Sequence, residues 1–569
     1  MARLAAVAGS LILAAAASAA ALPRDAAPTV QLANGSYYGL HSSTYKQDIF
    51  MGVPFAQPPV GDLRLRQPQP LNSTWEGSRN ATEYGYQCIG YGSDQWAQTG
   101  DNYVNEDCLT LNVVRPEGVV PGTNLPVAVW IHGGGYFMGG GSDPRYNTSF
   151  LVQQSVDMGT PIVAVTINYR LSGWGFLFSK ELAAEGATNL GLRDQRLALH
   201  WIQENIGAFG GDKTKVTIFG ESAGGNSVGT HLIAYGGRDD GLFRAAISQS
   251  GASSGLPGDA SAQVWQPRYD ALLAATGCSG SADSVACLRA LPSAQLSAVF
   301  NSTLTTGWSF RPAVDGDLLQ DLGTTQLAEG RFVKVPYLLG CNTDEGGSFG
   351  RRGINTDEDF LGMVRASAPH IDEVTAQTIA ALYPDIPQIG VPSTLEGRPT
   401  GGLAAQLGKQ WKRSAAYVGD YYMHIPRRIA AQAWAREKVP VYSYNFDVRV
   451  QGLPAWHGAG HFQEVVFVFN NVQGQGYGNV GANPMAGGPA TFPRLANLMS
   501  RMWVSFVVNM DPNKAGIDIP AQWPVYSVDT PQNYVFDVNG TDIAHVERDL
   551  WRAEAIDYLS KRLGTIYGQ

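Results

Sequence analysis

The sequence is poor in cysteine and carries no tract of like charge. Five cysteines occur among its 569 residues, and none forms a Cys-x-x-Cys pair, which disfavours a zinc site. The formal net charge of −9 argues against nucleic acid or an anionic membrane surface as a partner. No linker-like segment or internal repeat divides the chain, and 44% of its residues are hydrophobic. We therefore expect one large domain with long insertions, covering residues 22–569.

One long apolar run is present, at the N-terminus. Met1-Ala2-Arg3 precedes an alanine-rich segment from Leu4 to Ala21 that ends in small residues, as in a secretory signal peptide. A membrane anchor is the alternative, but the run is short and alanine-heavy for a membrane span. The C-terminus is not hydrophobic enough for a second anchor or a lipid-attachment signal. We expect residues 1–21 to be a signal peptide and the protein to be secreted and extracellular, without a stable membrane anchor.

Two further features suit secretion. Cys88 and Cys108 bracket a polar loop, and Cys278 and Cys287 bracket a shorter one. This predicts two loop-closing disulfides, with Cys341 left over, in an oxidising compartment. The sequence also contains six Asn-x-Ser/Thr sequons, each of which would be a surface position if glycosylated. They are Asn34, Asn72, Asn80, Asn147, Asn301 and Asn539.

Apolar runs alternate with helical segments along most of the chain. The runs predicted as strands are Leu125–Ile131, Pro161–Ile167, Val216–Phe219, Phe243–Ser248, Val333–Leu339 and Val439–Phe446. The segments predicted as helices are Leu190–Ile206, Pro493–Val508 and His545–Arg562, with mostly helical structure over 255–330 and 355–435. Residues 29–75 are predicted to be a β-meander with loops, and 523–538 to be strand-like. The alternation predicts an α/β fold with a large, mostly parallel central sheet flanked by helices.

The segment Gly220-Glu221-Ser222-Ala223-Gly224 follows one predicted strand and precedes a segment of helical character. Gly-x-Ser-x-Gly at a strand-to-helix junction is typical of a nucleophile elbow, which exposes the serine hydroxyl. Its glycines lack the Cβ atoms that would collide across so tight a turn. An ordinary loop is the alternative, because glycine and serine are common in loops. A nucleophilic serine needs a base and an acid to orient that base, in the chain order Ser, Asp or Glu, His.

Several motifs resemble those of the type-B carboxylesterase/lipase family, which includes the cholinesterases, secreted fungal lipases and the inactive neuroligins. The matching runs are Glu106-Asp107-Cys108-Leu109-Thr110-Leu111-Asn112-Val113, His132-Gly133-Gly134-Gly135-Tyr136, Asn168-Tyr169-Arg170, Asn189-Leu190-Gly191-Leu192-Arg193-Asp194-Gln195, Phe209-Gly210-Gly211-Asp212, Phe219-Gly220-Glu221-Ser222-Ala223-Gly224-Gly225 and Gln249-Ser250-Gly251. The resemblance extends from about residue 29 to 563. It implies an α/β-hydrolase fold and a carboxylic ester hydrolase that forms an acyl-enzyme, acts on a small-molecule ester and needs no metal or organic cofactor.

The resemblance also implies roles for particular residues. The family's acid lies in a strand-end Asp-Glu-Gly, which selects Glu345 rather than Asp344. The family's histidine begins a His-x-x-Glu pattern, which selects His461 rather than His457. The implied catalytic residues are Ser222, Glu345 and His461, and the implied oxyanion-hole donors are the backbone N–H groups of Gly134, Gly135 and Ala223. A metal site of His457, His461 and Glu464 is the alternative, but Gly458 and Gly460 argue against the helix that it needs.

The substrate pocket is less sharply indicated. In the family's fungal lipases the loop inside the first disulfide forms a long amphipathic lid, whereas residues 89–107 are short and polar here. This departure favours an esterase over the alternative, a triacylglycerol or sterol-ester lipase. Candidates for the pocket are Trp96, Trp308, Phe310 and His457, with core packing as the alternative for the aromatic three. A neuroligin-like binding protein is disfavoured, because the serine, the acid, the histidine and the glycine triplet are all present and a transmembrane tail is not.

Overall fold

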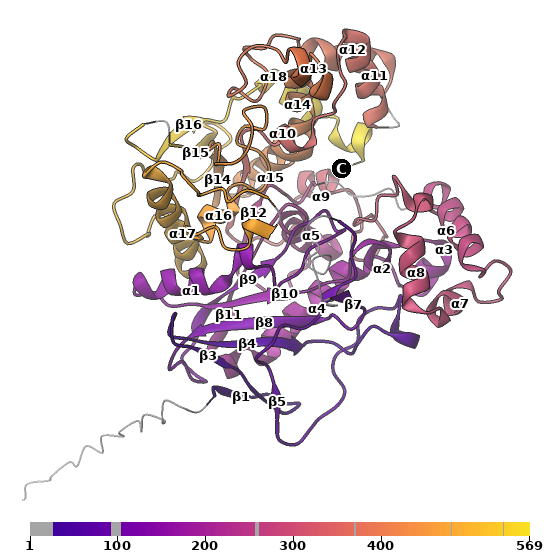
Figure 1. Cartoon of the computed structure of the whole chain (residues 1–569), viewed down its shortest axis with the longest axis vertical. Helices are drawn as coiled ribbons and strands as arrows, with labels where there is room; N and C mark the ends of the chain where they lie inside the picture. The colour runs from indigo at the N-terminus through magenta and orange to yellow at the C-terminus, as the bar shows by residue number, and fades with distance from the viewer. Residues whose placement is uncertain are drawn as a thin grey trace, which may run out of the picture.

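The computed structural model describes residues 27–92, 104–255, 261–368, 371–479, 481–538 and 540–568. The expected signal peptide, Trp96 and Asn539 lie outside these ranges. An eleven-stranded sheet has the order β16-β15-β14-β13-β12-β11-β9-β10-β8-β4-β3. Neighbouring strands from β10 to β15 pair in parallel, and the pairs at both ends are antiparallel. The sheet is therefore mostly parallel, as predicted (Figure 1).

The strands of this sheet are β3 (Leu40–Ser42), β4 (Gln47–Pro54), β8 (Thr110–Pro116), β9 (Leu125–Ile131), β10 (Val163–Ile167), β11 (Gly211–Glu221), β12 (Ala245–Gln249), β13 (Tyr337–Asn342), β14 (Val441–Phe446), β15 (Gln532–Phe536) and β16 (Ala544–Arg548). Two small sheets consist of β1 (Thr29–Gln31), β2 (Ser36–Tyr38) and β5 (Ser78–Asn80), and of β6 (Gln87–Cys88) and β7 (Val104–Asn105). The helices are α1 (Thr148–Asp157), α2 (Ser172–Phe176), α3 (Lys180–Ala184), α4 (Leu190–Asn205), α5 (Ala223–Gly237), α6 (Ala262–Thr276), α7 (Ser284–Ala290), α8 (Ser293–Phe300), α9 (Gly323–Ala328), α10 (Gly346–Phe349), α11 (Asp357–Ser367), α12 (Glu373–Leu382), α13 (Gly401–Leu407), α14 (Trp411–Gly419), α15 (Ile425–Arg436), α16 (Val465–Val468), α17 (Thr491–Asn509) and α18 (Ala553–Ser560).

The central strands are buried on both faces, which explains their continuous apolar runs. Along β9, Val127, Val129 and Ile131 belong to one hydrophobic core, while Ala128 and Trp130 belong to another. The first core includes residues of α4, α5 and α15, and the second includes residues of α1 and α17. Because successive side chains of a strand point to opposite faces, each face of the sheet has its own layer of helices.

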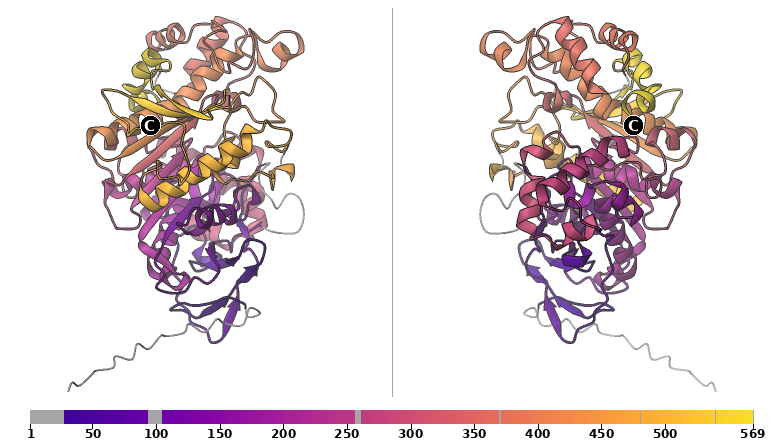
Figure 2. Two further views of the ribbon diagram at one scale, coloured as in Figure 1. Left: turned by 90° about the vertical axis from the view of Figure 1, so that its left-hand side faces the viewer. Right: turned by 90° about the vertical axis from the view of Figure 1, so that its right-hand side faces the viewer.

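Two helical insertions extend this layered core. Helices α6 to α8 lie on one side of the sheet, facing the viewer in the right-hand view of Figure 2. Helices α11 to α13 lie at one end of the molecule, and the N-terminal strands lie at the other (Figures 1 and 2). The end helices share a third hydrophobic core with α14 and α18. No helix in the described ranges combines the length and apolar character that a membrane crossing requires.

The C-terminal prediction was partly wrong. A helix was expected over His545–Arg562, but Ala544–Arg548 form β16, and helix α18 begins only at Ala553. β16 pairs antiparallel with β15, so that Phe536 faces Ala544 and Gln532 faces Arg548. The free N–H and C=O groups along the edge of β15 pair with those of β16. The spacing of apolar residues within the C-terminal segment carries no information about such a partner.

The predicted strand at Val333 begins later than expected. β13 starts at Tyr337, directly after Pro336. Proline has no N–H to donate to a neighbouring strand, although the Pro336 carbonyl still accepts from the N–H of Ala246. The parallel pairing of β13 with β12 then begins where Tyr337 lies opposite Ala246.

Both predicted disulfides are present, between Cys88 and Cys108 and between Cys278 and Cys287. Cys341 is buried in β13 and forms no disulfide with a described cysteine. Five of the six sequons fall in the described ranges. Asn72, Asn80 and Asn301 are exposed, whereas Asn34 and Asn147 are half-buried. Asn147 also caps α1, its side chain accepting from the N–H of Ser149.

Candidate active site

Ser222 lies at the sharp turn between β11 and α5. Its φ of 57° and ψ of −121° are unfavourable for a residue with a side chain. A Cβ at Gly220 would lie 2.5 Å from the Ile131 carbonyl oxygen, and a Cβ at Gly224 only 2.0 Å from the same atom. Both glycines are therefore required by close backbone packing. The N–H of Ser222 donates to the Gln249 carbonyl at the end of β12 (2.9 Å), which holds the turn in place.

His461 and Glu345 meet although they are 116 residues apart. Nδ1 of His461 lies 2.7 Å from Oε2 of Glu345. Glu345 follows β13 and is fully buried, and its other oxygen accepts from Ser250 Oγ (2.5 Å) and from the N–H of Asn342 (2.9 Å). Burial alone would raise the pKa of Glu345, but His461 and these hydrogen bonds lower it. Glu345 therefore presents an ionised carboxylate to the imidazole.

Asp344, the alternative acid, points elsewhere. Its Oδ2 accepts from the N–H of Ala459 (2.8 Å), and its own N–H donates to the Ala459 carbonyl (2.9 Å). These two bonds hold the loop that carries His461. His457 also has a different partner from His461, since its Nε2 lies 3.2 Å from Ser348 Oγ.

The second ring nitrogen of His461 faces another buried carboxyl group. Nε2 lies 3.2 Å from Oε1 of Glu221, the residue before Ser222. In the described chain no hydrogen bond joins Ser222 Oγ to His461. Burial raises the pKa of Glu221, and although burial alone would lower that of His461, Glu221 and Glu345 raise it to about 9. The buried carboxyl groups of Glu221 and Glu345 therefore favour the protonated form of His461.

A third buried carboxylate supports this cluster. Glu464 accepts from Asn342 Nδ2 (2.7 Å) and from Gln249 Nε2 (3.1 Å). Burial, followed by repulsion from Glu345, raises its pKa. In the sequence analysis, Glu464 appeared only as part of the His-x-x-Glu pattern that selects His461 and as part of the alternative metal site. Ser250 appeared there only within a motif that resembles the family's. Asn342 had no predicted role, because an asparagine at a strand end carries no distinctive local signal.

The glycine loop after β9 lies against the elbow. A Cβ at Gly133 would fall 2.6 Å from the Glu221 carbonyl oxygen and 3.1 Å from Ser222 Cβ, whereas a Cβ at Gly135 would meet nothing within 4 Å. Gly134 and Gly135 have φ values of 95° and 66°, which favour glycine. In the described chain no acceptor binds the N–H groups of Gly134, Gly135 or Ala223. These three donors are available to an incoming oxygen atom.

Buried contacts hold the glycine loop rigid. The His132 ring stacks on Tyr169 at 4.4 Å, and Tyr169 Oη donates to the His132 carbonyl (2.9 Å). The N–H of Gly141 donates to Asn168 Oδ1 (2.8 Å), and the N–H of Ser172 donates to the Tyr136 carbonyl (2.7 Å). Donors fixed in this way need little reorganisation when charge develops nearby.

The remaining pocket candidates lie in an aromatic cluster. Phe310 is buried and Trp308 is half-buried, with ring centroids 5.9 Å apart. Phe310 also packs against Trp265 (5.6 Å) and Phe300 (5.8 Å). A different aromatic residue, Phe349, lies beside the candidate histidine, with its ring 4.7 Å from that of His461. The sequence analysis did not single out Phe349.

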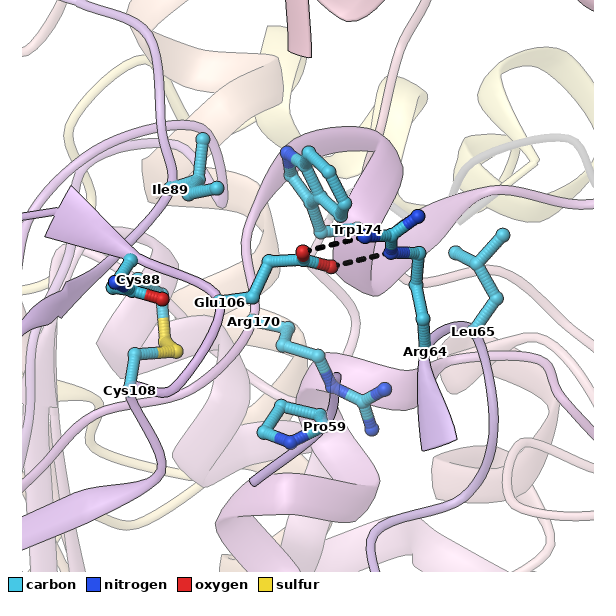
Figure 3. Close-up of a pocket in the computed structure, with 10 residues that line it drawn as sticks. Pro59, Arg64, Leu65, Cys88, Ile89, Glu106, Cys108, Arg170 and Trp174 are labelled. Carbon is cyan, nitrogen blue, oxygen red and sulfur yellow. Dashed lines mark hydrogen bonds and ion pairs between the residues drawn. A yellow bond between two sulfur atoms is a disulfide. The ribbon is translucent and has the colours of Figure 1, made fainter. Parts of the chain in front are cut away.

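The base of the first disulfide loop is firmly anchored (Figure 3). Arg64 donates to both oxygens of Glu106, at 2.6 and 2.7 Å, next to Trp174 and the Cys88–Cys108 disulfide. The cavity between these residues measures only about 10 Å³, which is about the space for one water molecule. It is too small for an ester substrate.

No group of three or more histidine, cysteine, aspartate or glutamate side chains in the described ranges could hold a metal ion. The arrangement instead unites a strained serine, a histidine paired with a carboxylate and three available N–H donors. Groups of these kinds can activate a hydroxyl nucleophile and stabilise an oxyanion.

Comparison with known proteins identifies close relatives. A family model described as "Carboxylesterase family" matches residues 26–550. "Lipase 4" of Diutina rugosa is 34% identical over 574 residues, covering 94% of this chain and 96% of its own. "Secreted triacylglycerol lipase LIP1" of Gibberella zeae is 32% identical over 587 residues, covering 97% and 93%. The crystal structure of Aspergillus niger EstA superimposes with a TM-score of 0.81 at 29% identity, covering 95% of this chain and 99% of its own.

Proposed function

The chain belongs to the carboxylesterase family and is a carboxylic ester hydrolase with an α/β-hydrolase fold, and from this premise we propose that it is a secreted serine esterase that cleaves soluble, small-molecule esters. Ser222 is the nucleophile, His461 the general base and Glu345 the residue that orients it. The observation that carries this assignment is the 2.7 Å contact between His461 and Glu345, next to the elbow that bears Ser222.

The proposed reaction has two steps. His461 Nε2 takes the proton of Ser222 Oγ as the oxygen attacks the ester carbonyl carbon, and the carbonyl oxygen becomes an oxyanion. The N–H groups of Gly134, Gly135 and Ala223 stabilise that oxyanion. The alcohol leaves with the proton from His461, and a water molecule, deprotonated by the same nitrogen, then releases the acid and restores Ser222.

This mechanism requires one rearrangement. Nε2 has to leave Glu221 Oε1, now 3.2 Å away, and turn toward Ser222 Oγ when substrate binds. Catalytic hydrogen bonds are often long or misaligned in the absence of substrate and tighten in the complex. Glu345, with its lowered pKa, remains ionised and stabilises the imidazolium that forms at His461.

Two observations bear on the substrate and the location. The polar residues 89–107 contrast with an amphipathic lid and support an esterase for soluble esters. The names of relatives such as "Secreted triacylglycerol lipase LIP1" support a lipase as the second candidate. The apolar N-terminal segment and the same relatives support export from the cell.

The deciding experiment measures kcat/KM of the purified protein on p-nitrophenyl esters from acetate to palmitate, with Ser222→Ala as the blank. We expect a maximum at short chains and no rate increase above the solubility limit of the substrate. A preference for long chains with a jump at the emulsion threshold would establish the lipase instead. Equal rates for wild type and Ser222→Ala would refute the serine mechanism.

A further inference from the structure

Arg311 carries a charge that no carboxylate in the described ranges balances. The buried arginines of the described chain all form ion pairs with carboxylates, as Arg64 does with Glu106. Arg311 is half-buried, and it forms neither a hydrogen bond nor an ion pair with any other described residue. A guanidinium stays protonated in proteins, and removing a charge from water without a partner is unfavourable. An unpaired arginine in this position therefore indicates a ligand.

The guanidinium of Arg311 can be reached from solvent at one edge. Of its three nitrogens, only Nε is sealed in the interior without a hydrogen-bond partner. Nη1 and Nη2 also lack partners in the described chain but are not sealed, so they remain accessible. The edge that carries these two nitrogens can bind both oxygens of a carboxylate through parallel hydrogen bonds.

The electrostatic surroundings of Arg311 contain no anion among the described residues. Burial lowers the pKa of Arg311, and the hydroxyl groups of Tyr422, Tyr421 and Tyr136 oppose this shift. Tyrosine hydroxyls are uncharged at neutral pH. The full positive charge of Arg311 is therefore available to a ligand.

Arg311 lies next to residues that surround the nucleophile elbow. Pro312, which follows Arg311 in the chain, lines a cavity of about 20 Å³ together with Tyr136 of the glycine loop and Asn226 of α5. The N–H of Asn226 donates to the carbonyl oxygen of Ser222 (2.8 Å). Tyr136 is also one of the tyrosines that act on the guanidinium. Arg311 is therefore close to the oxyanion loop and to the helix that begins at the nucleophile.

Tyr422, which also acts on Arg311, belongs to the surroundings of His461. It lies in a π-helical turn, Asp420–His424, between α14 and α15, and such turns are frequent at functional sites. Its ring packs against that of Phe349, with centroids 5.6 Å apart, and the Phe349 ring lies 4.7 Å from that of His461. The guanidinium is thus near groups on both sides of the candidate active site.

We propose that Arg311 makes the protein selective for esters that carry a free carboxylate, which Nη1 and Nη2 bind while the ester carbonyl reaches Ser222. The inference rests on the proposed function, because it takes Ser222 as the nucleophile. Arg311 makes and breaks no covalent bond. One water molecule is consumed, and the alcohol and the acid are released, as in the two-step reaction described above. The carboxylate belongs either to the acid part of the ester, as in a monoester of a dicarboxylic acid, or to the alcohol part.

Kinetics with matched esters tests the proposal and distinguishes the two parts of the ester. One set pairs the monoethyl esters of succinate, glutarate and adipate with the corresponding neutral amides. The other set pairs γ-acetoxybutyrate and δ-acetoxyvalerate with their amides. We expect kcat/KM, measured by titration of released acid at pH 8, to be at least about tenfold higher for the carboxylate in one set, because hydrogen bonds to ionised groups are about twice as strong as neutral ones. A ratio of one or less in every pair would overturn the proposal.

Variants of Arg311 locate the selectivity. Arg311→Gln removes the charge, so the kcat/KM ratio of the preferred pair should fall to about one. Arg311→Lys keeps the charge without the planar fork and should retain part of the ratio. Arg548→Gln, at an exposed position of β16, is the matched control and should keep the wild-type ratio. An undiminished ratio in Arg311→Gln would refute the role of Arg311.

Two further measurements separate other causes of a lost preference. Arg311→Gln removes an unpaired, partly buried charge, so it should unfold at the same temperature as wild type or at a higher one. If wild type cleaves p-nitrophenyl acetate without any carboxylate preference, the inference fails and the proposed function stands. If wild type cleaves none of the esters, the proposed function fails, and calorimetric titration with the same pairs decides on Arg311. Binding of a carboxylate ester at least about tenfold more tightly than its amide would then support the inference, and equal affinities would overturn it.

Discussion

Nε2 of His461 lies 3.2 Å from Oε1 of Glu221, the residue that precedes Ser222 in the elbow. The proposed nucleophile and the carboxylate beside it therefore compete for the same ring nitrogen. Glu221 is fully buried, so water does not screen its effect. The charge of Glu221 should therefore affect the pKa of His461, and with it the ability of His461 to accept the proton of Ser222.

The pH dependence of activity should reveal this effect. His461 acts as a base only when it is neutral, so kcat/KM should rise with pH through the pKa of the His461–Glu221 pair. A negative charge on Glu221 stabilises the imidazolium, so Glu221→Gln removes a cause of the raised pKa. We expect the acidic limb of the kcat/KM profile to move to lower pH by about one unit or more. A midpoint that stays in place or moves upward would contradict this, and the exposed Glu329→Gln is the control.

The hydroxyl of Ser250 should contribute to catalysis without touching substrate. It donates to Glu345 at 2.5 Å, and its loss leaves a buried carboxylate oxygen with one donor fewer. Ser250→Ala should lower kcat about tenfold with little change in KM. Glu345→Gln should lower kcat by about 10³ to 10⁴, the scale of comparable changes in serine hydrolases. An unchanged kcat for Ser250→Ala would contradict this role and leave Ser250 with a structural function only.

Close packing should make Gly224 irreplaceable. A methyl group there would lie 2.0 Å from the Ile131 carbonyl oxygen, so Gly224→Ala should destabilise the fold by about 1 to 3 kcal/mol. Gly362 in α11 is the matched control, because a Cβ there meets nothing within 4 Å. Gly362→Ala should stabilise the protein by up to about 1 kcal/mol through helix propensity. Calorimetric unfolding measures both, and equal effects would contradict the steric argument.

The buried ion pair of Asp420 and Arg552 should matter far more than an exposed one. Arg552 binds both Asp420 oxygens, at 2.5 and 2.6 Å, and Tyr383 Oη donates to the same carboxylate. Asp420→Asn should cost about 3 to 5 kcal/mol of unfolding free energy, because it leaves Arg552 buried without its counter-charge. Asp557→Asn breaks an exposed pair with Lys561 and should cost about 0.5 kcal/mol or less.

The same ion pair predicts a pH dependence of stability. Burial would raise the pKa of Asp420, but Arg552 and the hydrogen bonds lower it below its ordinary value. The stabilisation is therefore fully present above the unfolded-state pKa of about 3.9 and is lost as the pH falls below it. The stability difference between wild type and Asp420→Asn should shrink below about pH 4, and a constant difference down to pH 2 would contradict this assignment.

The sequence by itself determined the features that depend on short-range geometry. The glycines of the elbow and of the loop after β9 have left-handed or tightly packed backbones that only glycine allows, so their pattern is visible in the residues alone. Buried parallel strands leave continuous apolar runs, which predicted the α/β sheet, and the motifs predicted the family. The local periodicity of Ala544–Arg548 predicted a helix, but the segment forms a strand. The reason is its pairing with β15, which lies outside the segment and leaves no trace in its periodicity.

Only the tertiary structure decided which side chains meet. The contact of Glu221 with His461, the support of Glu345 by Ser250 and Asn342, and the position of Arg311 near the glycine loop join residues from separate strands and loops. Such contacts depend on how the packed helices and the sheet position whole loops, and no spacing along the chain encodes them. The sequence thus specified the candidate chemical groups and the turn that displays Ser222, while packing set the electrostatic surroundings in which those groups act.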